Sequence, residues 1–144
     1  MDCLSIAHSP AIQVSPDHTV LEAVELTLPA KLGAVAVVEF GKLTGIFTER
    51  DVMLKVVHGR RDPATTRVRE VMTAPVITIP RYISRKDVMT LMLKHHIRHL
   101  PISSDGKIVL GMLSIRNVLE YLVDELSTDL RHMEAYLGAD SPGG

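Results

Sequence analysis

The chain has few of the residues that build an aromatic core or a disulfide framework. Among its 144 residues there is no tryptophan, and there are only two phenylalanines and three tyrosines. The core must therefore consist mainly of valine, leucine, isoleucine, methionine and alanine. The single cysteine, Cys3, excludes a disulfide within the chain, which is typical of proteins from reducing compartments.

The chain also lacks an excess of charge of one sign and any long apolar segment. Its formal net charge of −1 gives no general attraction to nucleic acid or to an acidic membrane. The longest apolar run, near residues 34–38, is far shorter than the ~20 residues that a membrane span requires. No signal peptide is predicted at the N-terminus. We expect a cytoplasmic, soluble protein of one compact domain that binds neither nucleic acid nor membrane.

A segment near the middle of the chain recurs near its end. Residues 45–51 read GIFTERD and residues 111–117 read GMLSIRN, 66 positions apart. Upstream the offset is 65, as Gln13-Val14 against Thr78-Ile79 shows, and one extra residue after Lys107 accounts for the change. This internal duplication predicts two related units, neither of which is expected to fold alone.

Each repeat is predicted to form strand, helix, strand, strand and helix, which makes the fold class α/β (α+β). The elements of the first repeat are expected at 12–14, 20–28, 35–38, 43–47 and 49–57, with a capping box at Thr19 and Glu22. Those of the second are expected at 76–79, 84–95, 99–103, 108–113 and from 116 onward. A polar stretch with glycine and proline, 58–66, is the expected linker, and a short helical turn at 68–72 follows it.

We assign residues 1–66 to the first repeat with its linker, 67–126 to the second repeat, and 127–144 to a helix extension with a loose tail from 138. The last helix is longer than its counterpart in the first repeat. It has an apolar stripe with steps of three and four residues, formed by Ile115, Leu119, Leu122, Leu126, Leu130, Met133 and Leu137. The stripe fits packing on its own domain and contact with a second copy equally well.

The repeated turn places a hydroxyl and a carboxylate or amide at the start of a helix. Thr48 lies beside unpaired backbone N–H groups and the positive end of the helix dipole, which suits a phosphate. Asp51, one turn later, can accept two hydrogen bonds from a vicinal diol such as ribose. The pairs Thr48/Asp51 and Ser114/Asn117 also fit ordinary helix N-caps worth ~1 kcal/mol each, and their local pattern alone favours capping.

The span from about residue 12 to residue 121 resembles a tandem pair of cystathionine-β-synthase (CBS) domains, the Bateman module. The residues that carry the resemblance are 45–51, Val71-Met72-Thr73 before 76–79, the segment 96–102 that reads HIRHLPI, and 111–114. The resemblance implies two small sheets with helices on one side, packed with pseudo-twofold symmetry. It also implies a cleft for an adenosine ligand, namely AMP, ADP, ATP, S-adenosylmethionine or NAD(H), and pairing of modules into a homodimer.

The same resemblance assigns roles to individual residues. Asp51 would bind ribose, Thr48 phosphate, and the backbone near Gln13, Val14, Val35 and Ala36 the adenine. In repeat two, Ser114 and Asn117 would face phosphate and ribose, and the base would be lined by Thr78, Ile79, Leu100 and Pro101. Phosphate would also be met by Arg98, His99 and Arg116, and Arg50 completes the expected ligand-binding set.

The two sites are expected to be unequal. Asn117 stands where the family pattern has an aspartate, and it lacks the charge that strengthens a hydrogen bond to a hydroxyl. Arg98 and His99 correspond to the uncharged Gly33 and Ala34 of repeat one. We therefore expect the Thr48/Asp51 site to hold adenosine best, with phosphate contacts from the other repeat.

Other clusters are interpreted as structural. His95, His96 and His99 are close in sequence, but Pro101 and the expected strand separate their faces, and no cysteine or carboxylate completes a metal site. The arginines of the linker region fit a solvated surface or, alternatively, contact with a bound polyphosphate; they are Arg60, Arg61, Arg67 and Arg69.

The sequence therefore predicts a stand-alone regulatory module for energy sensing, without cofactor or metal, that acts on a separate, unidentified protein. A structural or interaction protein with vestigial sites is the alternative. An enzyme is disfavoured, because no nucleophile–base pair, phosphate loop or zinc-hydrolase motif occurs.

Overall fold

The computed structural model describes residues 1–139, so most of the expected tail lies outside the described residues. Its first repeat forms a three-stranded sheet in the order β1-β2-β3, with β1 parallel and β3 antiparallel to β2. The elements are β1 (Gln13–Val14), α2 (Val20–Thr27), β2 (Ala34–Glu39), β3 (Lys42–Thr48), α3 (Glu49–Asp51) and the π-helix η1 (Val52–Val57). The Thr19 capping box is formed as predicted.

The second repeat follows the same plan with fewer paired strands. Its elements are α5 (Arg85–His95), β4 (His99–Ile102), β5 (Gly111–Ser114) and α6 (Ile115–Ala139). The predicted strand at 76–79 is reduced to one parallel bridge between Ile79 and Ile102. In repeat one the Ala36 N–H donates to the Ile12 carbonyl, but Pro101, which corresponds to Ala36, has no N–H to donate to Ile77. The strand predicted from 108 begins only at Gly111, since the Asp105 carboxylate accepts hydrogen bonds from the backbone N–H of Lys107 and Ile108 and holds them in a turn.

The repeats exchange short helices. The helices α1 (Cys3–Ile6) and α4 (Val68–Val71) occupy equivalent positions, 65 residues apart. Cys3 packs in the core of the second repeat, whereas Val68 and Val71 pack in the core of the first. The residues that follow are exchanged as well, because the segment 7–9 pairs with β5 through His8 and Met112, and Thr73 pairs with Ile46 of β3.

A third apolar cluster joins the two sheets. Its buried members are Ala11, Ala34, Ala36, Ile46, Val109 and Met112, with Leu43 and Val76 packed against them. Most of these residues are equivalents at the repeat offset, such as Ile46 with Met112 and Ala11 with Val76. The duplicated sequence therefore packs against its own copy with pseudo-twofold symmetry, and the α/β architecture of two repeats with a C-terminal helix is confirmed.

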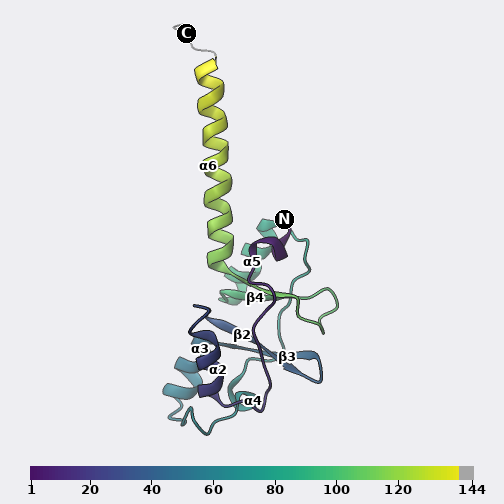
Figure 1. The fold of residues 1–144 in the computed structure, drawn as a ribbon, viewed down its shortest axis with the longest axis vertical. Coiled ribbons are helices and arrows are strands. Elements are labelled where there is room, and N and C mark those ends of the chain that lie inside the picture. Colours follow the sequence, from purple (N-terminus) through teal and green to yellow (C-terminus); the bar gives the residue numbers. More distant parts are fainter. Residues whose placement is uncertain (140–144) are drawn as a thin grey trace.

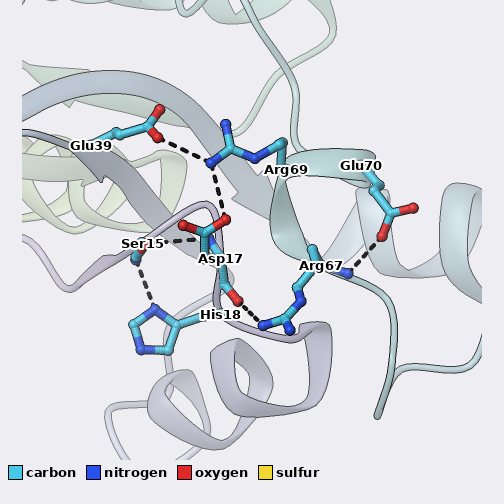
Figure 2. A network of polar contacts seen from close by, with 7 residues as sticks. All are labelled: Ser15, Asp17, His18, Glu39, Arg67, Arg69 and Glu70. Carbon is cyan, nitrogen blue, oxygen red and sulfur yellow. Dashed lines mark hydrogen bonds and ion pairs between the residues drawn. The ribbon is translucent and has the colours of Figure 1, made fainter.

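A polar network fastens α4 to repeat one (Figure 2). The Arg69 guanidinium donates to the carboxylates of Asp17, before α2, and Glu39, at the end of β2, at 3.0 Å each. Arg67 donates to the backbone carbonyl of Asp17, and its own N–H donates to Glu70 at 2.8 Å. Two of the four linker arginines thus hold the exchanged helix in place, and a third, Arg61, pairs with Glu70.

Helix α6 leaves the body of the molecule as a long rod (Figure 1). It continues through Gly138, two residues into the segment expected to be a loose tail. Within residues 1–139 no helix is both long and apolar enough to cross a membrane.

Candidate functional site

The repeated turn forms the same hydrogen-bonded cap in both halves. The Thr48 hydroxyl accepts from the Asp51 N–H at 3.3 Å, and Asp51 Oδ2 accepts from the Thr48 N–H at 3.0 Å. In repeat two, Ser114 accepts from the Asn117 N–H at 3.1 Å, and Asn117 Oδ1 accepts from the Ser114 N–H at 2.9 Å. Both pairs therefore act as helix caps. In each, the second polar atom of the Asp51 or Asn117 side chain takes no part in the cap.

The glycine of the motif is explained by the exchanged segments. A Cβ on Gly45 would lie 2.6 Å from Met72 Sδ and 3.2 Å from the Thr73 carbonyl oxygen. A Cβ on Gly111 would lie 2.9 Å from Leu4 and 3.1 Å from the His8 carbonyl oxygen. Each glycine thus allows the backbone of the exchanged segment to pass close to the strand that leads into the site.

The remaining oxygen of Asp51 has two partners that the sequence analysis missed. Asp51 Oδ1 accepts from the Thr73 hydroxyl at 2.8 Å and pairs with Lys55 Nζ at 3.0 Å. Asp51 is 5% exposed, whereas Thr73 is exposed and Lys55 is partly exposed. The spacing of Asp51 and Lys55, four residues on a helix, was a readable signal. The contact with Thr73 depends on the exchange of segments.

The π-helix η1 carries Lys55 toward this carboxylate. Wide-turn hydrogen bonds run from the His58 N–H to the Met53 carbonyl and from the Arg61 N–H to the Val56 carbonyl. A Cβ on Gly59 would lie 2.3 Å from the Lys55 carbonyl oxygen, so the backbone here admits only glycine without a shift. Single wide turns of this kind often occur at functional sites.

The corresponding positions of repeat two hold different groups. At the repeat offset, Lys55 corresponds to Tyr121 and Thr73 to His8. The second site therefore has neither the carboxylate of Asp51 nor the ammonium group of Lys55. The two halves share a backbone frame but differ in charge.

Residues of the two repeats meet beside the predicted site. An added Cβ on Gly33 would lie 2.4 Å from Glu49 Oε1 and 3.0 Å from His99 Cε1, so these three residues are neighbours. Burial lowers the pKa of His99; Glu49 opposes this effect and Arg98 adds to it. The neutral form of His99 is therefore favoured, next to a carboxylate that the sequence analysis did not single out. Arg50 also crosses the junction, because it donates to the His96 carbonyl at 3.3 Å.

The predicted ligand-binding residues fall into two groups, one in each repeat. In repeat one, Gln13 pairs with Ala36, and Ala34, next to Val35, pairs with Thr48. In repeat two, His99 pairs with Ser114, and Pro101 pairs with Met112 and accepts from the Ile79 N–H. The side chains of Val14, Val35, Ala36 and Ile79 are buried in cores, so only their backbone can meet a ligand. The side chains of Arg50, Arg98 and Arg116 are exposed.

Comparison with known families identifies these two halves. The family model described as CBS domain matches the chain twice, at residues 4–58 and 68–124. The chain belongs to the CBS-domain family. The first match begins at residue 4, earlier than the resemblance from residue 12 had indicated, and so includes most of the exchanged helix α1.

Similar proteins include two CBS domain-containing proteins. The chain is 33% identical over 127 residues to CBS domain-containing protein YhcV of Bacillus subtilis, covering 85% of this chain and 90% of that protein. It is 35% identical over 126 residues to the mitochondrial CBS domain-containing protein CBSX3 of Arabidopsis thaliana, covering 84% of this chain but only 61% of that protein.

A solved CBS structure shows the same fold. The CBS domain pair of protein MJ0100, in complex with 5′-methylthioadenosine and S-adenosyl-L-methionine, superposes with a TM-score of 0.77 at 21% identity, covering 87% of this chain and 98% of that one. This likeness establishes the fold.

Proposed function

We propose that this CBS pair is a regulatory module that binds an adenine nucleotide between its two repeats. The observation that carries the proposal is the hydroxyl and carboxylate of Thr48 and Asp51 at the start of a helix, beside the junction where Arg50 meets His96 and Glu49 lies near His99 of the opposite repeat. A hydroxyl at a helix start suits phosphate, and a carboxylate suits a ribose diol. The MJ0100 pair, which shares this fold, holds adenosyl ligands.

Binding at Asp51 requires an exchange of partners. Both acceptors of the carboxylate are used in the described structure, one by Thr48 and one by Thr73 and Lys55. Thr73 and Lys55 are reached by solvent, so a ribose diol can replace them at Oδ1 while the Thr48 cap stays intact. Displaced Lys55 is then a cation next to the ligand, which favours an anionic nucleotide such as AMP, ADP or ATP over a neutral nucleoside.

The two sites are proposed to differ in affinity. Asn117 retains the cap that Asp51 makes, but it has no charge to strengthen a hydrogen bond to ribose. We therefore assign the tighter site to repeat one, with Arg98 and Arg116 of repeat two and Arg50 placed for the phosphates. S-adenosylmethionine and NAD(H) are weaker candidates, since the first brings a positive charge to this basic surface and the second requires room for a second nucleoside.

Regulation would follow from differential binding. A ligand can shift the equilibrium between two arrangements of the module by no more than the difference between its binding free energies for them. We propose a homodimer that acts on a separate protein in the cytoplasm and performs no reaction itself. The exchanged segment that carries Thr73 is the natural element to respond, because it touches both Asp51 and β3.

The test is calorimetric titration with AMP, ADP, ATP, S-adenosylmethionine and NADH. We expect saturable binding of an adenine nucleotide, and a loss of affinity of roughly tenfold in Asp51→Asn, which keeps the cap but removes the charge. Asn117→Asp is the matched variant, and it should strengthen the second site and raise the stoichiometry. No heat and no thermal shift with any compound at millimolar concentration would refute the proposal.

A second candidate function has an observation of its own. Asp51 is already saturated by groups of its own chain, which is also what a vestigial site used only for structure requires. In that case the protein is an interaction module, and Asp51→Asn changes no binding because none exists. The same titration separates the two functions.

A further inference from the structure

The outer part of α6 has an apolar face that no described part of the chain covers. Ile115, Val118 and Leu122 at its base pack on the core of repeat two. Beyond the base, Figure 1 shows the helix standing alone. Six residues that are about half to two-thirds exposed form what we call the α6 seam: Leu119, Val123, Leu126, Leu130, Met133 and Leu137.

The spacing of the α6 seam is that of a two-helix contact. Successive members are 4, 3, 4, 3 and 4 residues apart, which is a period of 3.5. An apolar row at this period runs along one side of a helix that winds around another helix. The stripe read from the sequence had included Ile115 and Leu122, but these two belong to the body. With Val123 in their place, the exposed row becomes regular.

We propose that the α6 seam binds the α6 seam of a second copy of this chain in an antiparallel pair. This inference extends the homodimer proposed above by naming its surface. The order of the spacings is the same from either end of the α6 seam. In an antiparallel pair, each seam residue of one copy therefore lies opposite a seam residue of the other. The facing pairs are Leu119 with Leu137, Val123 with Met133, and Leu126 with Leu130.

The flanks of the α6 seam favour the antiparallel direction. Leu122 and Tyr136 lie on the same flank, and Tyr136 is 70% exposed. An antiparallel pair places Tyr136 of the second copy against Leu122. There it meets a hollow of about 470 Å³ between α5 and α6, whose lining includes Met1, Met89 and Leu122. A parallel pair would place Leu122 against Ser127 instead, and Tyr136 near the helix end.

The area available to the pair is that of a small interface. Full burial of a leucine, valine or methionine side chain removes roughly 60–120 Å² of apolar surface, and the seam side chains are already about 40% buried. The seams of two copies therefore cover roughly 400–900 Å². The flanks and the hollow must supply the remainder of the ~1,200 Å² at the lower end of specific protein interfaces.

Charge gives the pair a recognisable salt dependence. Acidic residues border the α6 seam, and an antiparallel pair brings Asp129 next to Asp129 of the second copy and Glu120 next to Glu134. Like charges across the contact oppose association, and salt screens them. Association is therefore expected to tighten as the salt concentration rises, in contrast to an interface built on ion pairs.

The first experiment measures mass in solution by sedimentation velocity between ~5 and ~200 µM. We expect a dimer for the wild-type chain and a weakening of at least 100-fold in Leu126→Glu/Leu130→Glu, because four carboxylates would enter the apolar contact. Ala135→Glu is the control, since it adds the same charge on the exposed face opposite the α6 seam. Both positions of the double variant are exposed, so circular dichroism should report an unchanged fold.

The second experiment tests direction with a short bis-maleimide crosslinker. Ser127→Cys should crosslink, because two copies of this residue face each other in the antiparallel pair, whereas Thr128→Cys points outward and should not. Native Cys3 is fully buried and stays unreactive. A dimer that survives Leu126→Glu/Leu130→Glu, or one that fails to crosslink through Ser127→Cys, overturns the inference. Titration of the double variant with AMP and ATP separates this failure from failure of nucleotide binding, which should persist in a monomer.

Discussion

Replacing Asp51 in two ways separates its structural role from its proposed binding role. Asp51→Ala removes the acceptor for the half-buried N–H and hydroxyl of Thr48, at about 1 kcal/mol of unfolding free energy each. The Thr73 and Lys55 groups are reached by water, so loss of their contacts adds less than ~1 kcal/mol. The expected loss of stability in Asp51→Ala is therefore about 2–3 kcal/mol.

Asp51→Asn should cost much less. Repeat two shows why, because Asn117 Oδ1 already accepts from both the N–H and the hydroxyl of Ser114, at 2.9 and 2.8 Å. An asparagine at position 51 can make the same cap. It loses the pairing with Lys55, and its NH2 group cannot accept from the Thr73 hydroxyl; both partners are reached by water, so the cost is less than ~1 kcal/mol. The difference between the two variants, about 2 kcal/mol, reflects the cap alone.

Urea unfolding and thermal unfolding, both followed by circular dichroism, measure the two variants. At about 3 °C per kcal/mol for a chain of this size, the melting temperature should fall by roughly 6–9 °C for Asp51→Ala and by no more than about 3 °C for Asp51→Asn. Equal losses in the two variants would show that charge, and not the cap, is what Asp51 contributes. No loss in Asp51→Ala would refute the reasoning altogether.

Three further predictions concern other parts of the chain. Burial lowers the pKa of His99 below its ordinary 6.5, so as the pH falls the unfolded chain takes up a proton before the folded chain does. The free energy of unfolding should therefore decrease below about pH 6.5, and it should decrease less in His99→Gln. Urea unfolding at pH 7.5, 6.5 and 5.5 measures both proteins. An equal pH dependence in both proteins would count against this. Gly59→Ala should destabilise the fold by ~2 kcal/mol, because its Cβ would clash with the Lys55 carbonyl oxygen. Gly138→Ala, near the open end of α6, should be neutral or stabilising by up to ~1 kcal/mol. Equal effects of the two substitutions would argue against a close approach of the backbone at Gly59. Arg69→Ala should cost no more than ~1 kcal/mol, because its ion pairs with Asp17 and Glu39 are exposed, and a larger loss would mean that α4 depends on this one side chain.

Much of each half of the fold was predictable because it is written in local patterns. The Thr19 capping box, the apolar run that becomes β2 and the helix predicted at 84–95 depend on residues within a few positions of one another, and all form as expected. The predicted strand at 76–79 was wrong, because Pro101 in the neighbouring strand has no N–H to donate to Ile77 and only Ile79 is paired. Apolar pattern alone does not show whether a neighbour is present to pair with.

The candidate site was only half visible in the sequence. Thr48 and Asp51 were identified from their spacing at a helix start, and their hydrogen bonds agree with the capping interpretation. The contact of Thr73 with Asp51, and the proximity of Glu49 to His99, join residues that are far apart in the chain or in different repeats. No spacing rule reaches across such distances.

The amino-acid sequence by itself determined that there are two similar halves, where most of their helices begin, and that a long helix with an apolar stripe follows the second half. These properties follow from residue type and spacing, which act over one or two turns of backbone. The tertiary structure decided that α1 and α4 change places between the halves, and therefore that the exchanged segments pass close to Gly45 and Gly111. It also decided which residues of α6 belong to the body and which remain exposed, because burial depends on what another segment brings alongside.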